Sequence, residues 1–183
     1  LSRLVDGLMA LARAERGTAP AEALALAAIV SGRLDAWSAF ADEHAVRLAA
    51  DLDQTLTVRV APGSVEQALD NLIANAIDVS PRDGAIVVDA RLRSGFVEVR
   101  VTDDGPGMTD EQRARALDRF WRASAGGGGS GLGLAIVRQL IEADGGTVGL
   151  EAASGGGLCV VLRLRAAERE ARGRDRDPVS EPA

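Results

Sequence analysis

The stretch "DNLIANAIDVSP", residues 70–81, combines the pattern of a buried helix with two asparagines placed four residues apart. An apolar stripe at helical spacing runs through it and the residues before it, formed by Val65, Ala68, Leu69, Leu72, Ala76 and Ile77. A second, polar face carries Gln67, Asn71, Asn75 and Asp78. A solvated surface face is one interpretation of this pattern. The other is a ligand site, because an asparagine carbonyl suits Mg²⁺ and its amide can donate to phosphate.

The segments on either side of this helix predict the fold class. Further helices are expected at residues 27–43, 110–117 and 132–144, and Ser64 and Gln67 have capping-box spacing at the start of the central helix. Strand patterns occur at residues 45–52, 55–61, 85–93, 95–103, 147–152 and 158–165. This order predicts an α+β fold, a two-layer sandwich of a mixed, mainly antiparallel sheet with about three helices on one face.

The two ends of the chain differ from its centre. Residues 1–16 have helical apolar spacing, which is typical of an amphipathic helix on a core or of the end of a bundle helix. Residues 17–20 then form a linker, and residues 21–165 form the main domain. From residue 166 to 183 the sequence is charged and lacks periodicity, so we expect a disordered tail. Because the chain starts in mid-pattern, we expect it to be a fragment.

Composition excludes several classes of function. The 183 residues carry a formal net charge of −6, which disfavours a general nucleic-acid binder. Cys159 is the only cysteine and His44 the only histidine, so neither an intrachain disulfide nor a Cys/His zinc site can form. No apolar run approaches the roughly 20 residues that a membrane-spanning helix needs.

A strand that ends in two aspartates and a glycine turn is a second candidate site. In "VTDDGPGM", residues 101–108, Asp103 and Asp104 precede Gly105 and Gly107. A tight turn capped by aspartate is one interpretation. The other is a carboxylate at a strand end that accepts a hydrogen bond from a ligand amine, above a floor that glycine leaves bare.

A glycine-rich loop that leads into a helix is the third candidate. In "GGGGSGLGLAIV", residues 126–137, the helix start presents unpaired N–H groups and the positive end of its dipole to an anion. No lysine follows the glycines, so the segment is not a Walker A loop, and no strand directly precedes it as in a Rossmann fold. A plain linker before a helix is the alternative.

Together, these segments resemble the catalytic ATP-binding domain of bacterial sensor histidine kinases, a branch of the Bergerat-fold ATPase superfamily. "QALDNLIANA" resembles its N box, "DDGPG" its first glycine box, "LDRFWR" its F box, "GSGLGLAIV" its second glycine box and "GGTVGLEAASGGG" its closing hairpin. The resemblance covers residues 21–165, and residues 1–17 resemble the end of the second helix of the dimerisation and phosphoacceptor domain.

The resemblance implies a role for each matching residue. Asn75 matches the asparagine that coordinates Mg²⁺, Asn71 its catalytic partner near the phosphates, and Asp103 the aspartate that accepts the adenine amino group. The other implied nucleotide-binding residues are Gly105 and Gly107 beside adenine, Phe120 and Arg122 in the ATP lid, and Gly129, Gly131, Leu132, Gly133 and Leu134 at the phosphates.

The resemblance also implies an activity and partners. The chain is expected to bind ATP and Mg²⁺ and to donate the γ-phosphoryl group to a histidine on its own upstream dimerisation domain, in a homodimer. A response-regulator aspartate is the expected final recipient. The domain is expected to lie in the cytoplasm, in a protein attached to the membrane by other parts.

Two departures from the family pattern leave alternatives open. The family has a basic residue and then an aromatic one at the positions of Asp78 and Val79. Related chaperone and mismatch-repair ATPases have an aspartate there, but they carry a glutamate base where this chain has Asn71. An amide cannot deprotonate water, which favours phosphoryl transfer over hydrolysis. Asp78 and the glycine run keep a degenerate nucleotide-binding module open as an alternative.

The phosphate acceptor is the remaining question. His44 lies outside every matched segment and is expected at the surface, so we expect this chain to bind Mg-ATP without phosphorylating itself. An anti-sigma-type serine kinase shares the implied fold and is a further alternative. The helix predicted at residues 1–16 argues against it, because that family needs no bundle before its ATP domain.

Overall fold

The computed structural model describes residues 19–122 and 131–167. The strands are β1 Glu22–Ala25, β2 Arg47–Leu52, β3 Thr57–Val60, β4 Ala85–Arg93, β5 Phe96–Asp103, β6 Thr147–Ala152 and β7 Leu158–Arg165. The helices are α2 Leu26–Glu43, α3 Ser64–Val79, α4 Asp110–Arg115 and α5 Gly133–Ala143. The helix predicted at residues 1–16, Gly129 and the tail beyond residue 167 lie outside the described residues.

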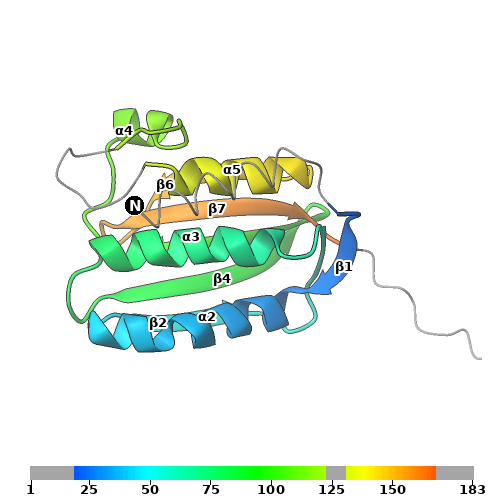
Figure 1. Ribbon diagram of the computed structural model, residues 1–183, viewed down its shortest axis with the longest axis horizontal. Coiled ribbons are helices and arrows are strands. Elements are labelled where there is room, and N and C mark those ends of the chain that lie inside the picture. The colour runs from blue at the N-terminus through cyan, green and yellow to red at the C-terminus, as the bar shows by residue number, and fades with distance from the viewer. Residues whose placement is uncertain (1–18, 123–130, 168–183) are drawn as a thin grey trace, which may run out of the picture.

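The architecture is a two-layer sandwich, as predicted. Five strands form one sheet in the order β2-β4-β5-β7-β6, in which β2 and β4 are parallel and every other pair is antiparallel. Helices α2, α3 and α5 lie next to one another across one face of this sheet, while the short α4 lies apart from them (Figure 1). The α+β class, the mixed sheet and the three covering helices are therefore confirmed.

The core forms where the apolar faces of the helices meet the sheet. In β5 the valines at 97, 99 and 101 are buried, while the alternating polar residues face the other way, as the period of two predicts. The whole predicted apolar stripe of α3 is buried against them. The helix that carries the two asparagines is thus held between α2, α5 and the sheet.

The start of α3 differs from the prediction. Gly63, not Ser64, is the N-cap residue, and it adopts a left-handed conformation with φ +85°. Ser64 is buried, and its hydroxyl donates to the Asp144 carboxylate, which also accepts the Ala61 N–H at 3.0 Å. The expected capping box between Ser64 and Gln67 is therefore wrong. Through these two hydrogen bonds Asp144, directly after α5, joins the end of α5 to the start of α3.

Two short segments at the sheet end were also missed. Strand β1, with the sequence EALA, pairs antiparallel with β3 although its residues have low strand propensity. Ala166 and Ala167, expected in the tail, donate backbone hydrogen bonds to Gly95 and Thr57. In both cases backbone hydrogen bonds to a neighbouring segment order residues whose own sequence does not predict a strand.

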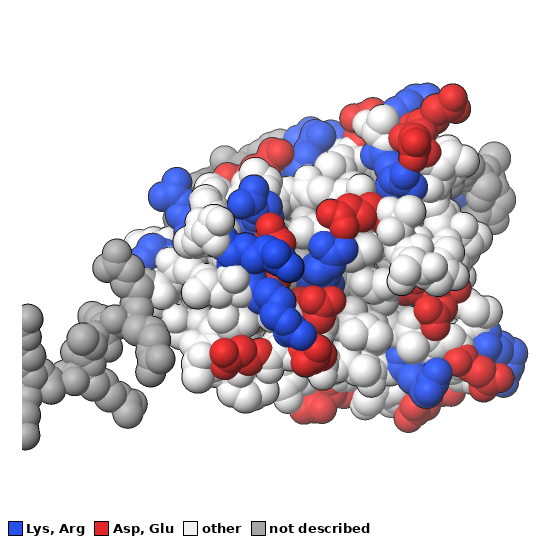
Figure 2. Space-filling model, turned by 180° about the vertical axis from the view of Figure 1, so that it is seen from behind, with Lys and Arg blue, Asp and Glu red and all other residues white. Residues whose placement is uncertain are grey.

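The face of the sheet opposite the helices is open and charged. Figure 2 shows this face, where positively and negatively charged side chains lie next to one another. Glu98 lies 3.3 Å from both Arg93 and Arg163, and Arg100 lies 2.6 Å from Glu151. Ion pairs between different strands of the sheet keep this face polar. No helix within residues 19–122 and 131–167 has the length and apolar character to cross a membrane.

Candidate functional site

Asp103 ends β5 and is almost fully buried, with 7% of its surface exposed. Its Oδ1 accepts two backbone hydrogen bonds, from the Gly105 N–H at 2.9 Å and the Leu158 N–H at 3.2 Å. Burial raises the pKa of the carboxyl, and the two backbone donors oppose this rise. Among the described residues no hydrogen bond reaches Oδ2, so this oxygen can accept one from a ligand.

The side chain of the neighbouring Asp104 binds the backbone of another strand. Its Oδ2 accepts the N–H of Ala85, the first residue of β4, at 2.9 Å. It therefore closes the exposed start of a strand. Of the two adjacent aspartates, only Asp103 is a buried residue whose Oδ2 accepts no hydrogen bond from the described residues.

Glycines surround Asp103 because other residues would not fit. A Cβ at Gly105 would lie 2.8 Å from Asp103 Oδ1 and 2.9 Å from Val79 Cγ2. Gly107 has a left-handed conformation, with φ +66°, and a Cβ there would lie 2.4 Å from the Gly156 carbonyl oxygen. The bare floor predicted from "DDGPG" is thus present. Val79, 49% exposed at the end of α3, lies against this floor.

Gly157 and Leu158, predicted only as part of the closing hairpin, also hold Asp103. Leu158 supplies the second backbone donor, and a Cβ at Gly157 would lie only 1.7 Å from the Asp103 carbonyl oxygen. The run of glycines at residues 155–157 was a signal that this turn packs closely against something. Its partner lies about fifty residues away in the chain, so no local pattern identifies it.

The two asparagines of α3 have different surroundings. Asn71 is half-buried, and its Nδ2 donates to the carbonyl of Gln67 at 2.8 Å, which leaves its own oxygen for another partner. Asn75 is exposed. A Cβ at Gly133 would lie 2.8 Å from Asn75 Nδ2 and 3.2 Å from its Oδ1. Glycine at the first position of α5 thus lets this helix start directly beside the carboxamide.

The start of α5 is suited to an anion. The helix has 11 residues, and no side chain caps its N-terminus. Its first N–H groups therefore have no partner within the helix, and its dipole adds positive potential. Leu132 is buried in the core, so its side chain anchors the helix start rather than facing a ligand, and Leu134 is partly buried against the core.

The predicted lid residues lie next to the start of α5. The Phe120 N–H donates to the Gly131 carbonyl at 3.0 Å, and a Cβ at Gly131 would lie 2.9 Å from Trp121 O. Phe120 has an unusual φ of +65° and is 65% exposed. Arg122 is also exposed. The F-box segment and the glycine box are therefore joined by direct backbone contact.

His44, the only histidine, follows α2 at the surface, as predicted. Its Nδ1 lies 2.8 Å from the Phe40 carbonyl oxygen, and its ring packs against that of Phe40 at a centroid distance of 4.3 Å. These contacts give the histidine a local structural partner.

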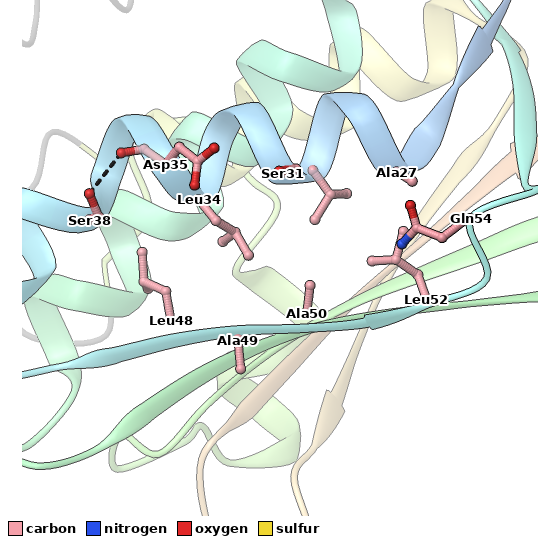
Figure 3. Close-up of a pocket in the computed structure, with 11 residues that line it drawn as sticks. Ala27, Ser31, Leu34, Asp35, Ser38, Leu48, Ala49, Ala50, Leu52 and Gln54 are labelled. Carbon is pink, nitrogen blue, oxygen red and sulfur yellow. Dashed lines mark hydrogen bonds between the residues drawn. The ribbon is translucent and has the colours of Figure 1, made fainter.

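A groove of about 420 Å³ lies elsewhere, between α2 and β2 (Figure 3). Its lining is largely aliphatic, with Leu34, Leu48 and Leu52 among the residues drawn, and Ser38 Oγ donates to the carbonyl of Asp35 at 2.8 Å. None of the predicted site residues lines it. The candidate site at α3, the Asp103 loop and α5 is thus separate from this groove.

The site offers three kinds of polar contact. Asp103 Oδ2 can accept a hydrogen bond, the N–H groups at the start of α5 can donate to an anion, and the Asn75 carboxamide lies beside that start. Within residues 19–122 and 131–167, no group of three or more His, Cys, Asp or Glu side chains could hold a metal. A carboxamide beside bound phosphates is a different kind of metal site, to which the ligand itself adds oxygens.

Sequence comparisons point to one family. The family described as histidine kinase-, DNA gyrase B- and HSP90-like ATPase matches residues 60–168. The two-component sensor PhoQ of Pseudomonas aeruginosa is 36% identical over 139 residues, 76% of this chain and 31% of that protein. The sensor-like histidine kinase SenX3 of Mycobacterium tuberculosis is 34% identical over 142 residues, 75% of this chain and 35% of that protein. The chain thus spans about a third of the length of these curated relatives.

Solved structures agree with this assignment. Full-length ShkA in complex with AMPPNP is 27% identical, with a TM-score of 0.78 over 90% of this chain and 35% of that one. The mycobacterial sensor histidine kinase MprB is 25% identical, with a TM-score of 0.70 over 80% of this chain and 97% of that one. Because the family model matches more than half of the chain and curated sensor kinases are over 30% identical across three quarters of it, the chain belongs to the histidine kinase-, DNA gyrase B- and HSP90-like ATPase family, as a catalytic domain of the two-component sensor kinase type.

Proposed function

We propose that this domain binds Mg-ATP and donates the γ-phosphoryl group to a histidine on the dimerisation helices of its own protein. The buried Asp103 carries this proposal, because a carboxylate with one oxygen held by two backbone donors presents the other to a base amine. The adenine ring would lie over Gly105 and Gly107, next to Val79. The ATP-analogue complex of the similar kinase ShkA supports a nucleotide in this family.

The phosphates would extend from the base toward α5. In this arrangement Gly131, Gly133 and the backbone of Leu132 and Leu134 lie at the helix start, where unpaired N–H groups meet negative charge. We place Gly129, Phe120 and Arg122 in the lid that covers the nucleotide. Arg122 would add a positive charge near the phosphates.

The residues of α3 fit a magnesium ion. The Asn75 carbonyl is a hard oxygen ligand, and Asn71 keeps an oxygen free because its nitrogen bonds within the helix. When bound, Mg²⁺ neutralises phosphate charge that develops during transfer. Asn71 cannot act as a base toward water, so the site favours transfer to a separate nucleophile over hydrolysis.

The partners follow from this reaction. The nucleophile would be a histidine on the helices whose end we assign to residues 1–16, in a homodimer, and a response-regulator aspartate would receive the phosphate afterwards. We place the domain in the cytoplasm, in a protein attached to the membrane by other segments. His44 is not the acceptor in this scheme, because it follows α2 and packs on Phe40.

Calorimetric titration with the ATP analogue AMPPNP, with and without Mg²⁺, tests the binding step. The wild-type chain is expected to bind more tightly with Mg²⁺, and Asn75→Ala is expected to lose most of this difference. Equal affinity with and without the metal would instead support the degenerate binding module. For the transfer step, the chain incubated with γ-labelled ATP is expected to gain no label, and label removed by His44→Gln would contradict the acceptor assignment.

A further inference from the structure

The turn between β6 and β7 packs its backbone against Asp103. Hydrogen bonds within the turn, from Ala153 N–H to Gly157 O at 2.9 Å and from Gly156 N–H to Ala153 O at 3.0 Å, fix its shape. A Cβ at Gly157 would lie 1.7 Å from Asp103 O, too close to be absorbed by a side-chain movement. The contact therefore exists only because residue 157 is glycine.

The same turn gives Asp103 its second hydrogen bond. Residue 158 follows Gly157 directly, and its N–H donates to Asp103 Oδ1, the oxygen that the Gly105 N–H also reaches. These donors come from two segments that are distant in sequence, one from the loop after β5 and one from the start of β7. Two donors on one oxygen restrict rotation of the carboxylate, which determines where the other oxygen points.

We propose that the β6–β7 turn is a positioning element for base recognition, in which Gly157 allows the approach and the Leu158 N–H orients the Asp103 carboxylate. The turn acts through Asp103 and does not itself contact the base. This inference rests on the proposed function, in which Asp103 recognises the amino group of adenine.

Gly157→Ala tests this role, with Gly155→Ala as its matched control. Gly155 lies two residues earlier in the same turn, has no left-handed φ, and a Cβ there would meet nothing within 4 Å. The readout is the ratio of the dissociation constants of purine riboside triphosphate and ATP, both with Mg²⁺. These ligands differ only in the 6-amino group that Asp103 would accept. A general loss of structure weakens both and leaves the ratio unchanged.

The wild-type chain and Gly155→Ala are expected to prefer ATP by about 5- to 150-fold, the value of one buried hydrogen bond. Gly157→Ala is expected to bring this ratio close to one. A ratio that stays at the wild-type value in Gly157→Ala overturns the positioning role. A ratio already near one in the wild-type chain, with ATP still bound, contradicts the recognition of adenine by Asp103 instead, so the two failures are distinguishable.

A second measurement uses the unmodified chain, in case Gly157→Ala does not fold. The amide proton resonances of Gly105 and Leu158 are expected to shift together as the Asp103 carboxyl titrates, and neither shift is expected in Asp103→Asn. If the Gly105 amide resonance shifts with this titration and the Leu158 amide resonance does not, the inference is overturned.

Discussion

Alanine at position 133 is expected to weaken nucleotide binding without destabilising the fold. The added Cβ would lie 2.8 Å from Asn75 Nδ2 and 3.4 Å from its Cγ. These atoms form the end of a flexible side chain on the exposed face of α3, and no backbone atom outside α5 lies among the three nearest. The methyl group is therefore accommodated by rotation of the Asn75 carboxamide away from the start of α5.

Two effects of opposite sign determine the result. Alanine is favoured over glycine within a helix by up to about 1 kcal/mol, and by less at the first position, where Gly133 lies. Displacing Asn75 removes one metal or phosphate contact, which costs about 1–3 kcal/mol of binding free energy. This loss corresponds to a roughly 5- to 150-fold weaker affinity for Mg-AMPPNP, with an unchanged or slightly higher free energy of unfolding.

Urea unfolding and calorimetric titration measure the two quantities, and a double-mutant cycle tests the mechanism. If Gly133→Ala acts through Asn75, adding it to Asn75→Ala should weaken binding no further. Gly149→Ala is the control, because a Cβ at this position of β6 meets nothing within 4 Å. Additive losses in the double variant, or unfolding destabilised as much as binding, would refute the reasoning.

Three further variants or measurements test separate parts of the structure. Asp103→Asn should lose affinity for ATP. The two backbone N–H donors keep the side-chain oxygen in the Oδ1 position, so the amide nitrogen of the variant takes the position of Oδ2 and faces the adenine amine, another donor. Since burial raises the pKa of this carboxyl above its ordinary value of 3.8, its contribution to stability is largest below that pH and is lost as pH rises through the folded-state pKa. Asp103→Asn should therefore raise the free energy of unfolding at neutral pH, and this gain should vanish below about pH 3.8 in urea titrations. Asp144→Ala should destabilise the chain by about 1–3 kcal/mol in urea unfolding, because Ala61 N–H and the Ser64 hydroxyl lose their acceptor, and an unchanged midpoint would contradict this link. Cys159, 2% exposed and with its thiol pKa raised by burial, should react with a thiol reagent only as fast as the chain unfolds, which a comparison of labelling and unfolding rates measures.

Much of the fold follows from periodicity in the sequence. The alternation of valines in β5 and the helical apolar stripe of α3 each identify one buried face, and both faces are buried as predicted. Such patterns are local, because the spacing of apolar residues within one helix or strand determines which of its faces is apolar. They suffice for the α+β class and for the layer of helices on the sheet.

Contacts between distant segments were not predictable in the same way. Strand β1 exists because β3 pairs with it, and the start of α3 is hydrogen-bonded to Asp144, about eighty residues later in the chain. The spacing of Ser64 and Gln67 was compatible with a capping box, but a buried hydroxyl found a stronger acceptor in a carboxylate. Local rules describe what a residue can do, and the tertiary fold decides which of these options it uses.

The candidate site shows the same division. Resemblance assigned roles to Asp103, Asn75 and Gly133, and the structure adds a physical reason for two of them: buried Asp103 keeps one oxygen available, and Gly133 leaves room for Asn75. The reason for Gly157 appears only when the β6–β7 turn is seen against β5. Three of these four positions matter because of what lies beside them in space. The two glycines therefore differ in what an added methyl group would meet: at Gly157 it would meet the backbone of Asp103, which cannot turn away, and at Gly133 it would meet only the Asn75 side chain, which can.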